Sequence, residues 1–382
     1  MGGPAAGRHG MNEERCDVAI IGAGPAGATA AGLLAAKGRR VLLIDRAKFP
    51  RPAPCAGWLS SGAIPLLQEL GIGTKPITDR AFRDVTFYRA DFSQKAKPAF
   101  AEPAGFLIDR KRFDHELVRA AVRAGATLVE GAAAAKLKLK ESAVIVELAN
   151  QRRLESRLLL IAAGRGSELL ERAGIPLRSA VTPLWIAQVE AEVPRAVAPK
   201  TPYVGIVLGL DQSGSFALCC VGPERLSLGV NWMGESREVI PTLVRVCGQM
   251  FGHGAVPVDL SQQAATATVI RSPASAALDM DTHVGKHTLV IGEAGGFIAA
   301  VSSEGIYPAM WSAQIASQVA HEALDSVHSQ DALMSFDSQW RMKMADYLRS
   351  PHTDIQFLLP LIFTNQPMAD RMGAAFFHGE NI

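Results

Sequence analysis

The strongest constraint on the fold of this chain is a glycine-rich turn at residues 22–27, which directly follows the apolar run 18–21. A short, continuous apolar run of this kind is typical of a buried parallel strand. In such a turn Gly22 permits the sharp change of direction, Gly24 lets a diphosphate approach the backbone, and Gly27 lets the next helix pack closely on the strand. The order therefore predicts a strand, a phosphate-binding turn and a helix.

The residues after the turn complete this pattern. Residues 25–37 are rich in alanine and leucine, with Ala26 near their start, and are predicted to form the helix. A helix N-terminus carries unpaired N–H groups and a partial positive charge, which suits a diphosphate. The apolar run 41–44 predicts a second buried strand, and Asp45 at its end can bond a ribose hydroxyl. We interpret the unit as a dinucleotide site that prefers FAD or NAD to NADP, with a purely structural turn as the alternative.

Composition limits the classes of protein to which the chain can belong. Its 382 residues, 48% of them hydrophobic, suffice for two domains or one large elaborated domain. A formal net charge of +2 gives no basic footprint, so nucleic acid is not expected as a partner. The five cysteines have no metal-ligand spacing and follow no secretory signal, which indicates reduced thiols in a cytoplasmic protein without a metal site. No apolar stretch reaches the ~18 residues that a bilayer span needs.

The chain leaves the nucleotide-binding pattern and later returns to it. Apolar runs that lead into glycine turns recur at 158–167 and 287–297, whereas short alternating runs between them are typical of an antiparallel sheet. We therefore predict an α/β fold with a Rossmann-type domain, an inserted and mostly antiparallel β-sheet domain, and a helical C-terminal segment. The predicted boundaries are a disordered leader at 1–14, a discontinuous nucleotide domain at 15–80, 105–180 and 271–325, a substrate domain at 81–104 and 181–270, and the helical segment at 326–382.

The segment 46–60 is a predicted loop, because proline disfavours both helix interiors and central strands. It contains Cys55 and Trp58, close in sequence to the ribose-binding end of the second strand. Contact with a ligand explains these side chains better than exposure to solvent, and a small buried thiol is the alternative for Cys55. Cys219 and Cys220 are neighbours in a predicted strand, so they point to opposite faces and packing is their expected role.

The apolar run 355–363 in the C-terminal segment is too short to span a bilayer. Three placements are open for it: a cover over a greasy substrate pocket, contact with a membrane surface, and burial against the body of the protein. Burial is the favoured interpretation.

Three segments together, 22–27, 110–114 and 292–306, resemble the FAD-binding motifs of the flavoprotein family that contains geranylgeranyl reductases, aromatic hydroxylases and flavin-dependent halogenases. The resemblance covers nearly the whole chain. Within the family, the proline-rich loop 49–57 with its cysteine is most similar to the geranylgeranyl reductase branch. The Rossmann-type domain is accordingly expected to bind FAD.

The resemblance implies a role for each matching residue. The glycine turn would hold the diphosphate, Asp45 and Arg46 would flank the adenosine ribose, and Arg110 would reach the FAD from its loop. The full set of implied cofactor contacts is Gly22, Gly24, Ala26, Gly27, Asp45, Arg46, Ala56, Gly57, Arg110, Gly292, Glu293, Gly305 and Ile306.

The third segment would lie beside the flavin, and the chain departs from the family there and in the middle of the domain. Glu293 stands where the family usually has aspartate, and the N–H groups of 305–306 would face the flavin ring, where a helix N-terminus stabilises the charge of a reduced flavin. Ala163 replaces a usual aspartate, and Ala300 and Ser303 stand where a proline and a glycine are usual. FAD affinity and nicotinamide use both depend on these positions.

The reaction that the resemblance implies is reduction of carbon–carbon double bonds in an isoprenoid or other lipid-like substrate by hydride from reduced FAD. Cys55 is the implied proton donor, with Tyr307 as a second candidate, and Trp58 and Trp232 are expected to contact the substrate. NAD(P)H or a ferredoxin-like partner would supply electrons. The alternatives are a flavin-dependent monooxygenase of a hydrophobic substrate and an FAD- or lipid-binding protein without turnover. The tryptophan motif typical of halogenases is absent.

Overall fold

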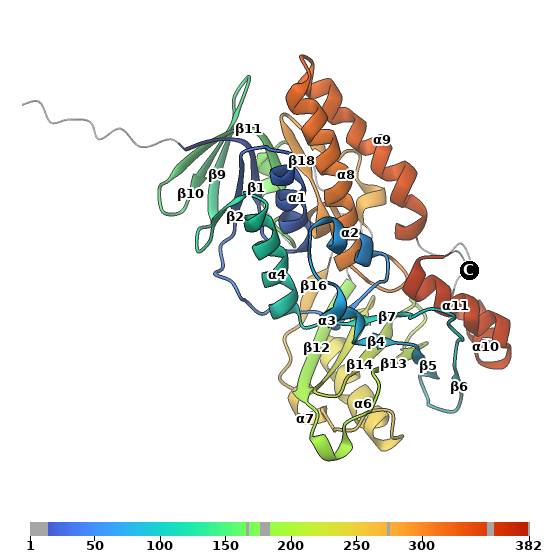
Figure 1. The fold of residues 1–382 in the computed structure, drawn as a ribbon. Coiled ribbons are helices and arrows are strands. Elements are labelled where there is room, and N and C mark those ends of the chain that lie inside the picture. Colours follow the sequence, from blue (N-terminus) through green and yellow to red (C-terminus); the bar gives the residue numbers. More distant parts are fainter. Residues whose placement is uncertain (1–13, 166–167, 176–183, 273–275, 350–354, 381–382) are drawn as a thin grey trace, which may run out of the picture.

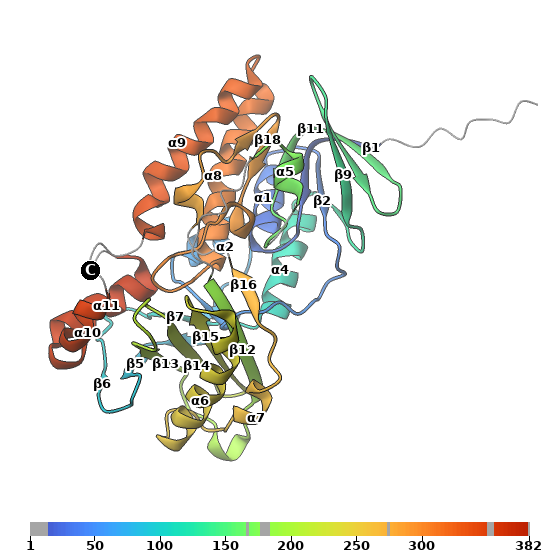
Figure 2. The same ribbon diagram turned by 180° about the vertical axis from the view of Figure 1, so that it is seen from behind.

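The computed structural model describes residues 14–165, 168–175, 184–272, 276–349 and 355–380. The expected leader, apart from Glu14, lies outside the described residues. The chain forms two large sheets at opposite ends of the molecule, joined by connecting segments and flanked by helices (Figure 1). The same view turned by 180° shows the second sheet with its own covering helices (Figure 2).

The first sheet is built around the strand that precedes the glycine turn. Its central strands run parallel in the order β17-β18-β11-β1-β2-β8, except that β17 is antiparallel to β18. The hairpin β9-β10 extends from the first half of β11. The bounds are β1 Glu14–Ile21, β2 Val41–Ile44, β8 Thr127–Val129, β9 Ala134–Leu139, β10 Val144–Leu148, β11 Arg153–Ile161, β17 Val284–Gly285 and β18 Thr288–Val290.

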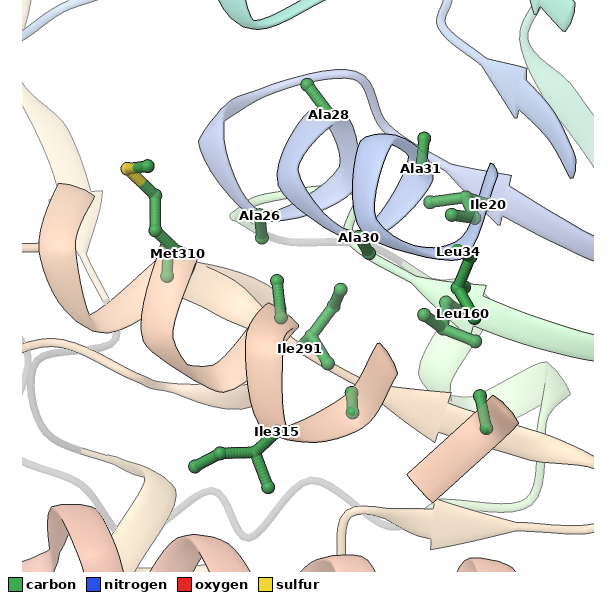
Figure 3. Close-up of a cluster of buried hydrophobic side chains, with 14 of the residues drawn as sticks. Ile20, Ala26, Ala28, Ala30, Ala31, Leu34, Leu160, Ile291, Met310 and Ile315 are labelled. Carbon is green, nitrogen blue, oxygen red and sulfur yellow. The ribbon is translucent and has the colours of Figure 1, made fainter. Parts of the chain in front are cut away.

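Helices cover one face of this sheet, and small residues let them approach closely. Helix α1 is buried from Ala26 to Ala35 and packs against α4 and α8. Figure 3 shows Ala26 and Ala30 on the side of α1 that faces Ile291 and the α8 side chain of Met310. The helices of this layer and of the C-terminal part are α1 Pro25–Ala36, α4 Arg110–Arg123, α8 Ile306–Asp325 and α9 Ser329–Leu348, while the hairpin and α5 Leu169–Arg172 pack on the opposite face.

The second sheet has the order β16-β12-β15-β14-β13-β5-β6 and is antiparallel except for the pair β13 and β5. Helices α6 Val239–Gly252 and α7 Ser261–Ala264 cover one face, and α10 Ile355–Thr364 and α11 Gln366–His378 pack on the other. Cys219 lies on the α6 side and Cys220 on the α11 side, as predicted. The strands are β5 Asp84–Arg89, β6 Lys95–Ala96, β12 Leu184–Glu192, β13 Tyr203–Leu208, β14 Phe216–Val221, β15 Arg225–Trp232 and β16 Ile270–Ser272.

A small three-stranded sheet and two short helices connect the large sheets. The strands β3 Trp58–Leu59, β7 Gly105–Leu107 and β4 Ala81–Phe82 pair in that order. The helices α2 Ala63–Glu69 and α3 Lys75–Thr78 follow β3 and precede β4 in the sequence. The predicted α/β class is confirmed, with a Rossmann-type domain, an inserted antiparallel sheet and a helical C-terminal segment.

Gly27 sets how closely α1 packs on β1. A Cβ atom built at Gly27 would lie 1.7 Å from the carbonyl oxygen of Gly22, which is backbone and cannot rotate away. Gly22 itself has φ +102°, a conformation that residues with a Cβ rarely adopt. The turn therefore requires glycine at both positions, for separate reasons.

We expect Gly27→Ala to destabilise the protein by about 3 kcal/mol or more, because α1 must move away from β1 and from the core that it shares with α8. Gly73→Ala is the matched control, since its Cβ meets nothing within 4 Å, and it should change stability by less than about 0.5 kcal/mol. Denaturant unfolding followed by circular dichroism measures both. Equal stability of the two variants would contradict the close approach.

Candidate active site

The carboxylate of Asp45 fixes the glycine turn. Its Oδ2 accepts a hydrogen bond from the N–H of Ala23 at 2.8 Å, and its Oδ1 accepts one from the N–H of Ala47 at 2.8 Å. The side chain is buried at the carboxyl end of β2, and the neighbouring Arg46 is exposed. The residue predicted to bond a ribose thus also ties the turn to the start of the next loop.

A buried ion pair stands at the first turn of α4. Asp109 caps this helix by accepting from the N–H groups of Lys111 and Arg112. Arg110 then forms a two-pronged pair with the fully buried Asp114, with distances of 2.8 and 2.9 Å. Burial alone would lower the pKa of Arg110, but Asp114 and then Cys55 outweigh it and raise that pKa above its usual value. Arg110 is a fixed cation at this site.

Sequence reasoning missed a second arginine at this carboxylate. Arg51, from the proline-rich loop, lies 3.5 Å from Asp114 Oδ2 and 3.9 Å from Asp45 Oδ2. The pattern of prolines around it signals a loop but does not say which charged residue of the loop turns inward.

The turn after β18 carries Glu293 and faces the start of α1. A Cβ at Gly292 would lie 2.7 Å from the Cβ of Ala26, so the two turns meet through their smallest residues. Glu293 pairs with Arg165 at 2.9 Å, and burial raises the pKa of Glu293 in spite of this partner. Arg165 follows Ala163 by two residues, so a cation stands near the place where the family has a carboxylate.

His283 anchors this turn to α9. Its Nε2 lies 2.8 Å from the carbonyl oxygen of Gly295, and its backbone N–H donates to Asp337 Oδ1 at 3.0 Å. A carbonyl only accepts, so Nε2 carries the hydrogen. Helix α9 therefore holds the Glu293 turn in place from behind.

A second residue that sequence reasoning missed, Glu304, lies just before the N-terminus of α8, where Gly305 is the N-cap and Ile306 the first helical residue. Its Oε1 accepts from the N–H of Ser60 at 3.1 Å and its Oε2 accepts from the hydroxyl of Tyr347 at 2.5 Å. Burial raises the pKa of Glu304 to about 7. The carboxyl thus joins α9 and the start of α2 to the loop predicted to face the flavin.

Tyr307 packs within this group. Its ring stacks on Trp311 with centroids 5.3 Å apart and meets Tyr347 edge to face at 5.4 Å. Burial, and then the charge of Glu304, raise the pKa of its hydroxyl to about 12. At Ser303 the backbone has φ +55°, the left-handed conformation that explains why the family usually has glycine there.

The raised pKa of Glu304, about 7 against an ordinary 4.5, means that the folded protein favours its neutral form. This contribution to stability is present below pH 4.5 and is lost as the pH rises through 7. We expect the wild type to lose about 2 to 3 kcal/mol more than Glu304→Gln between pH 5 and pH 8.

Denaturant unfolding at a series of pH values measures this difference. Glu102→Gln removes an exposed carboxylate and should retain the wild-type pH dependence. The same pH dependence in wild type and Glu304→Gln would show that Glu304 is ionised throughout.

A cavity of about 330 Å³ lies between the loop of Cys55, the start of α4 and the second sheet. The Cys55 sulfur, half-buried, accepts from the N–H of Gly57 at 3.3 Å and interacts electrostatically with the Arg110 guanidinium. The hydroxyl of Ser227 donates to the carbonyl oxygen of Ala56. The lining residues include Pro52, Cys55, Gly57, Arg110, Glu190, Cys220, Arg225 and Ser227.

The structure brings some of the predicted site residues together and separates others. Cys55 and Arg110 share the cavity. Trp58 is buried behind it against Phe376 and Phe377 of α11. Trp232 packs on the opposite, α6 side of the second sheet, because its position in β15 has the same parity as the residues that face α6.

The FAD-binding-domain family matches residues 15–242 of the chain. The chain belongs to this family. FAD fits the residues present: the backbone at Gly24 is open, with only Arg51 within 4 Å of an added Cβ, at 3.7 Å. The predicted membership of a flavoprotein family is confirmed.

Curated relatives of this FAD-binding chain include reductases. It is 24% identical over 336 residues to the digeranylgeranylglycerophospholipid reductase of Methanococcus aeolicus, which covers 86% of this chain and 82% of the relative. The corresponding protein of Methanocaldococcus jannaschii is 26% identical over 345 residues, 87% of this chain and 84% of the relative. The menaquinone reductase of Mycobacterium tuberculosis is 32% identical over 170 residues, 42% of this chain and 41% of the relative.

Solved structures share the fold. A geranylgeranyl bacteriochlorophyll reductase-like protein of Thermoplasma acidophilum has a TM-score of 0.74 at 18% identity, covering 97% of this chain and 98% of that one. A flavin-dependent brominase has a TM-score of 0.70 at 18% identity, covering 95% and 94%. These two likenesses show the shared fold. The FAD-binding-domain family and the reductases among its relatives make the chain an FAD-dependent oxidoreductase.

In the part of the chain that the structure describes, no helix is long and apolar enough to cross a membrane. The described residues also contain no group of three or more His, Cys, Asp or Glu side chains that could hold a metal ion.

Proposed function

We propose that the protein is an FAD-dependent reductase that saturates carbon–carbon double bonds of an isoprenoid or other lipid-like substrate. The observation that carries the proposal is the placement of Cys55, which lines a cavity together with the cofactor-side cation Arg110. The digeranylgeranylglycerophospholipid reductases that align along more than four-fifths of their length support the lipid character of the substrate.

The reaction adds a hydride to one alkene carbon and a proton to the other. Reduced FAD supplies the hydride when bound. The thiol of Cys55 holds the proton at Sγ, and the guanidinium of Arg110 stabilises the thiolate that remains after transfer. Solvent protons then restore the thiol. NAD(P)H and a ferredoxin-like protein are both suitable electron donors.

We expect the purified protein to show a flavin spectrum that bleaches anaerobically with NADPH or dithionite and returns on addition of a prenyl lipid with an isolated double bond. Cys55→Ala should bind and reduce FAD as the wild type does but reoxidise with the lipid about 100-fold more slowly, because the proton donor is gone. Stopped-flow absorbance measures both steps.

Cys16→Ala is the matched control, since it removes a buried thiol that belongs to the core of the first sheet and does not line the cavity. An unchanged rate of reoxidation in Cys55→Ala would remove the cysteine from the mechanism. Oxygen consumption coupled to substrate would indicate a monooxygenase, and a protein that takes up FAD but never turns over would indicate a binding protein.

We further propose that α10 contacts a lipid surface. Leu358 and Ile362 bury one face of this helix against the second sheet and α11, while Phe357 and Leu361, one turn apart, are 77% and 46% exposed on the other. Figures 1 and 2 both place α10 at the outer edge of the molecule. A helix with one packed face and one exposed aromatic and aliphatic face suits the boundary of headgroups and acyl chains.

The double variant Phe357→Glu with Leu361→Glu should lower binding to phospholipid vesicles about tenfold or more, because both side chains lose their transfer into the acyl region. Co-sedimentation with vesicles measures the binding. Met342→Glu, at a 78% exposed apolar position on α9, should bind as the wild type does. Failure of the wild type to bind, or equal binding by the double variant, would contradict the contact.

A further inference from the structure

The proline-rich loop between β2 and β3 turns one arginine toward the glycine turn. The Arg51 side chain is only 23% exposed, and its guanidinium carbon lies 4.9 Å from the centre of the Phe49 ring. Its Nη2 lies 3.7 Å from where a Cβ of Gly24 would be. Arg51 therefore stands directly in front of the N-terminus of α1.

This position is unfavourable for a cation unless an anion shares it. Helix α1 begins at Pro25, has no side-chain cap at Gly24, and has no acidic residue in its first turn. The helix end is positive, so it repels a guanidinium placed against it. Nothing in the helix itself compensates for this repulsion.

The two carboxylates nearest to Arg51 hold it only loosely. The distances from Arg51 to Asp45 and Asp114 are 3.9 and 3.5 Å, longer than charge-assisted hydrogen bonds. Asp45 already accepts from two backbone N–H groups, and Asp114 already accepts two bonds from Arg110. Within the described residues the guanidinium of Arg51 makes no hydrogen bond, so its N–H donors remain uncommitted.

We propose that Arg51 is a clamp for the diphosphate of the cofactor, which it holds from the side opposite the N-terminus of α1. A diphosphate between them would accept from backbone N–H groups on one side and from a two-pronged guanidinium on the other. The bound anion would then attract both Arg51 and the positive end of the helix, and this attraction would offset the repulsion between them. This inference rests on the FAD site alone and not on the proposed reaction.

The clamp also connects the cofactor to the loop that carries Cys55. Pro50, Pro52 and Pro54 alternate with Arg51, Ala53 and Cys55, and each proline fixes its own φ angle, so few conformations are open to the segment that joins Arg51 to Cys55. Asp114 adds a second connection, because it contacts Arg51 on one side and Arg110, the partner of Cys55, on the other. Binding of a diphosphate at Arg51 is therefore expected to order the cysteine loop.

The test compares ligands with and without a diphosphate on the apoprotein. FAD binding is followed by flavin fluorescence, and binding of ADP and adenosine by calorimetry. Arg51→Met should weaken the binding of FAD and of ADP about ten- to a hundredfold and leave the binding of adenosine unchanged. Arg51→Lys should have an intermediate affinity for FAD and ADP, because lysine keeps the charge but cannot donate two parallel hydrogen bonds as the guanidinium does. Hydrogen exchange in 46–57 should slow when ADP binds the wild type and not when it binds Arg51→Met.

Lys48→Met is the matched control: it removes an exposed cation from the same loop and should change ADP affinity less than about twofold. Thermal unfolding of the apoprotein shows whether each variant is folded. If Arg51→Met does not fold, the ligand affinities of Arg51→Lys provide the test instead. Wild-type affinity of Arg51→Met for ADP, or an equal loss for ADP and adenosine, would overturn the clamp. Both measurements are independent of turnover, so they stand whatever the substrate is.

Discussion

The contact on which the rest of the molecule depends is that between the backbone of the glycine turn and the first turn of α1. Because Gly27 has no side chain, the helix lies close against β1, and the small residues of α1 then allow α4 and α8 to pack on its other sides. The same absence of side chains leaves peptide groups bare at the helix end. The close packing of the helices and the open anion site therefore both result from the absence of side chains on the glycines of this turn.

Around that opening the chain places charges in alternation. Asp45, Arg51, Asp114 and Arg110 follow one another from the end of β2 to the start of α4. A buried carboxylate without a cation is costly, as is a buried cation without a carboxylate, so opposite charges are neighbours here. Asp114 holds Arg110 firmly, whereas Arg51 is held only loosely by Asp45 and Asp114. Glu293 and Arg165 form a separate pair from other segments. Arg165 of this pair follows Ala163 by two residues.

The sequence was informative where function depends on the backbone. A strand, a glycine turn and a helix leave a local signature, so the β1-turn-α1 unit and the α/β class could be predicted from the spacing of residues. The roles of Arg110 and Glu293 rest on the resemblance to the flavoprotein family and stay predictions. Arg165 and Glu304 could not be predicted, because their partners lie far along the chain: Glu304 is 244 residues from Ser60. Arg51 was missed because the prolines around it indicate a loop but not which of its charged side chains turns inward. For Trp232, spacing predicted a strand but not which face of the sheet would meet α6. The run 355–363 was predicted as buried, yet α10 keeps one apolar face exposed.

Arg225 joins the second sheet to α4, a helix that packs on the first sheet. From β15 it reaches Asp109 at 2.8 Å and Glu190 on β12 at 2.5 Å, and Asp109 is also the residue that caps α4. The Asp109 carboxylate, whose pKa stays below its usual value because the Arg112 N–H and Arg225 outweigh its burial, remains charged and serves both partners. If the second sheet separated from the nucleotide domain, Asp109, which caps α4, would lose its ion pair with Arg225. Arg225, which lines the cavity, therefore also stabilises the capped end of α4, the helix that carries Arg110.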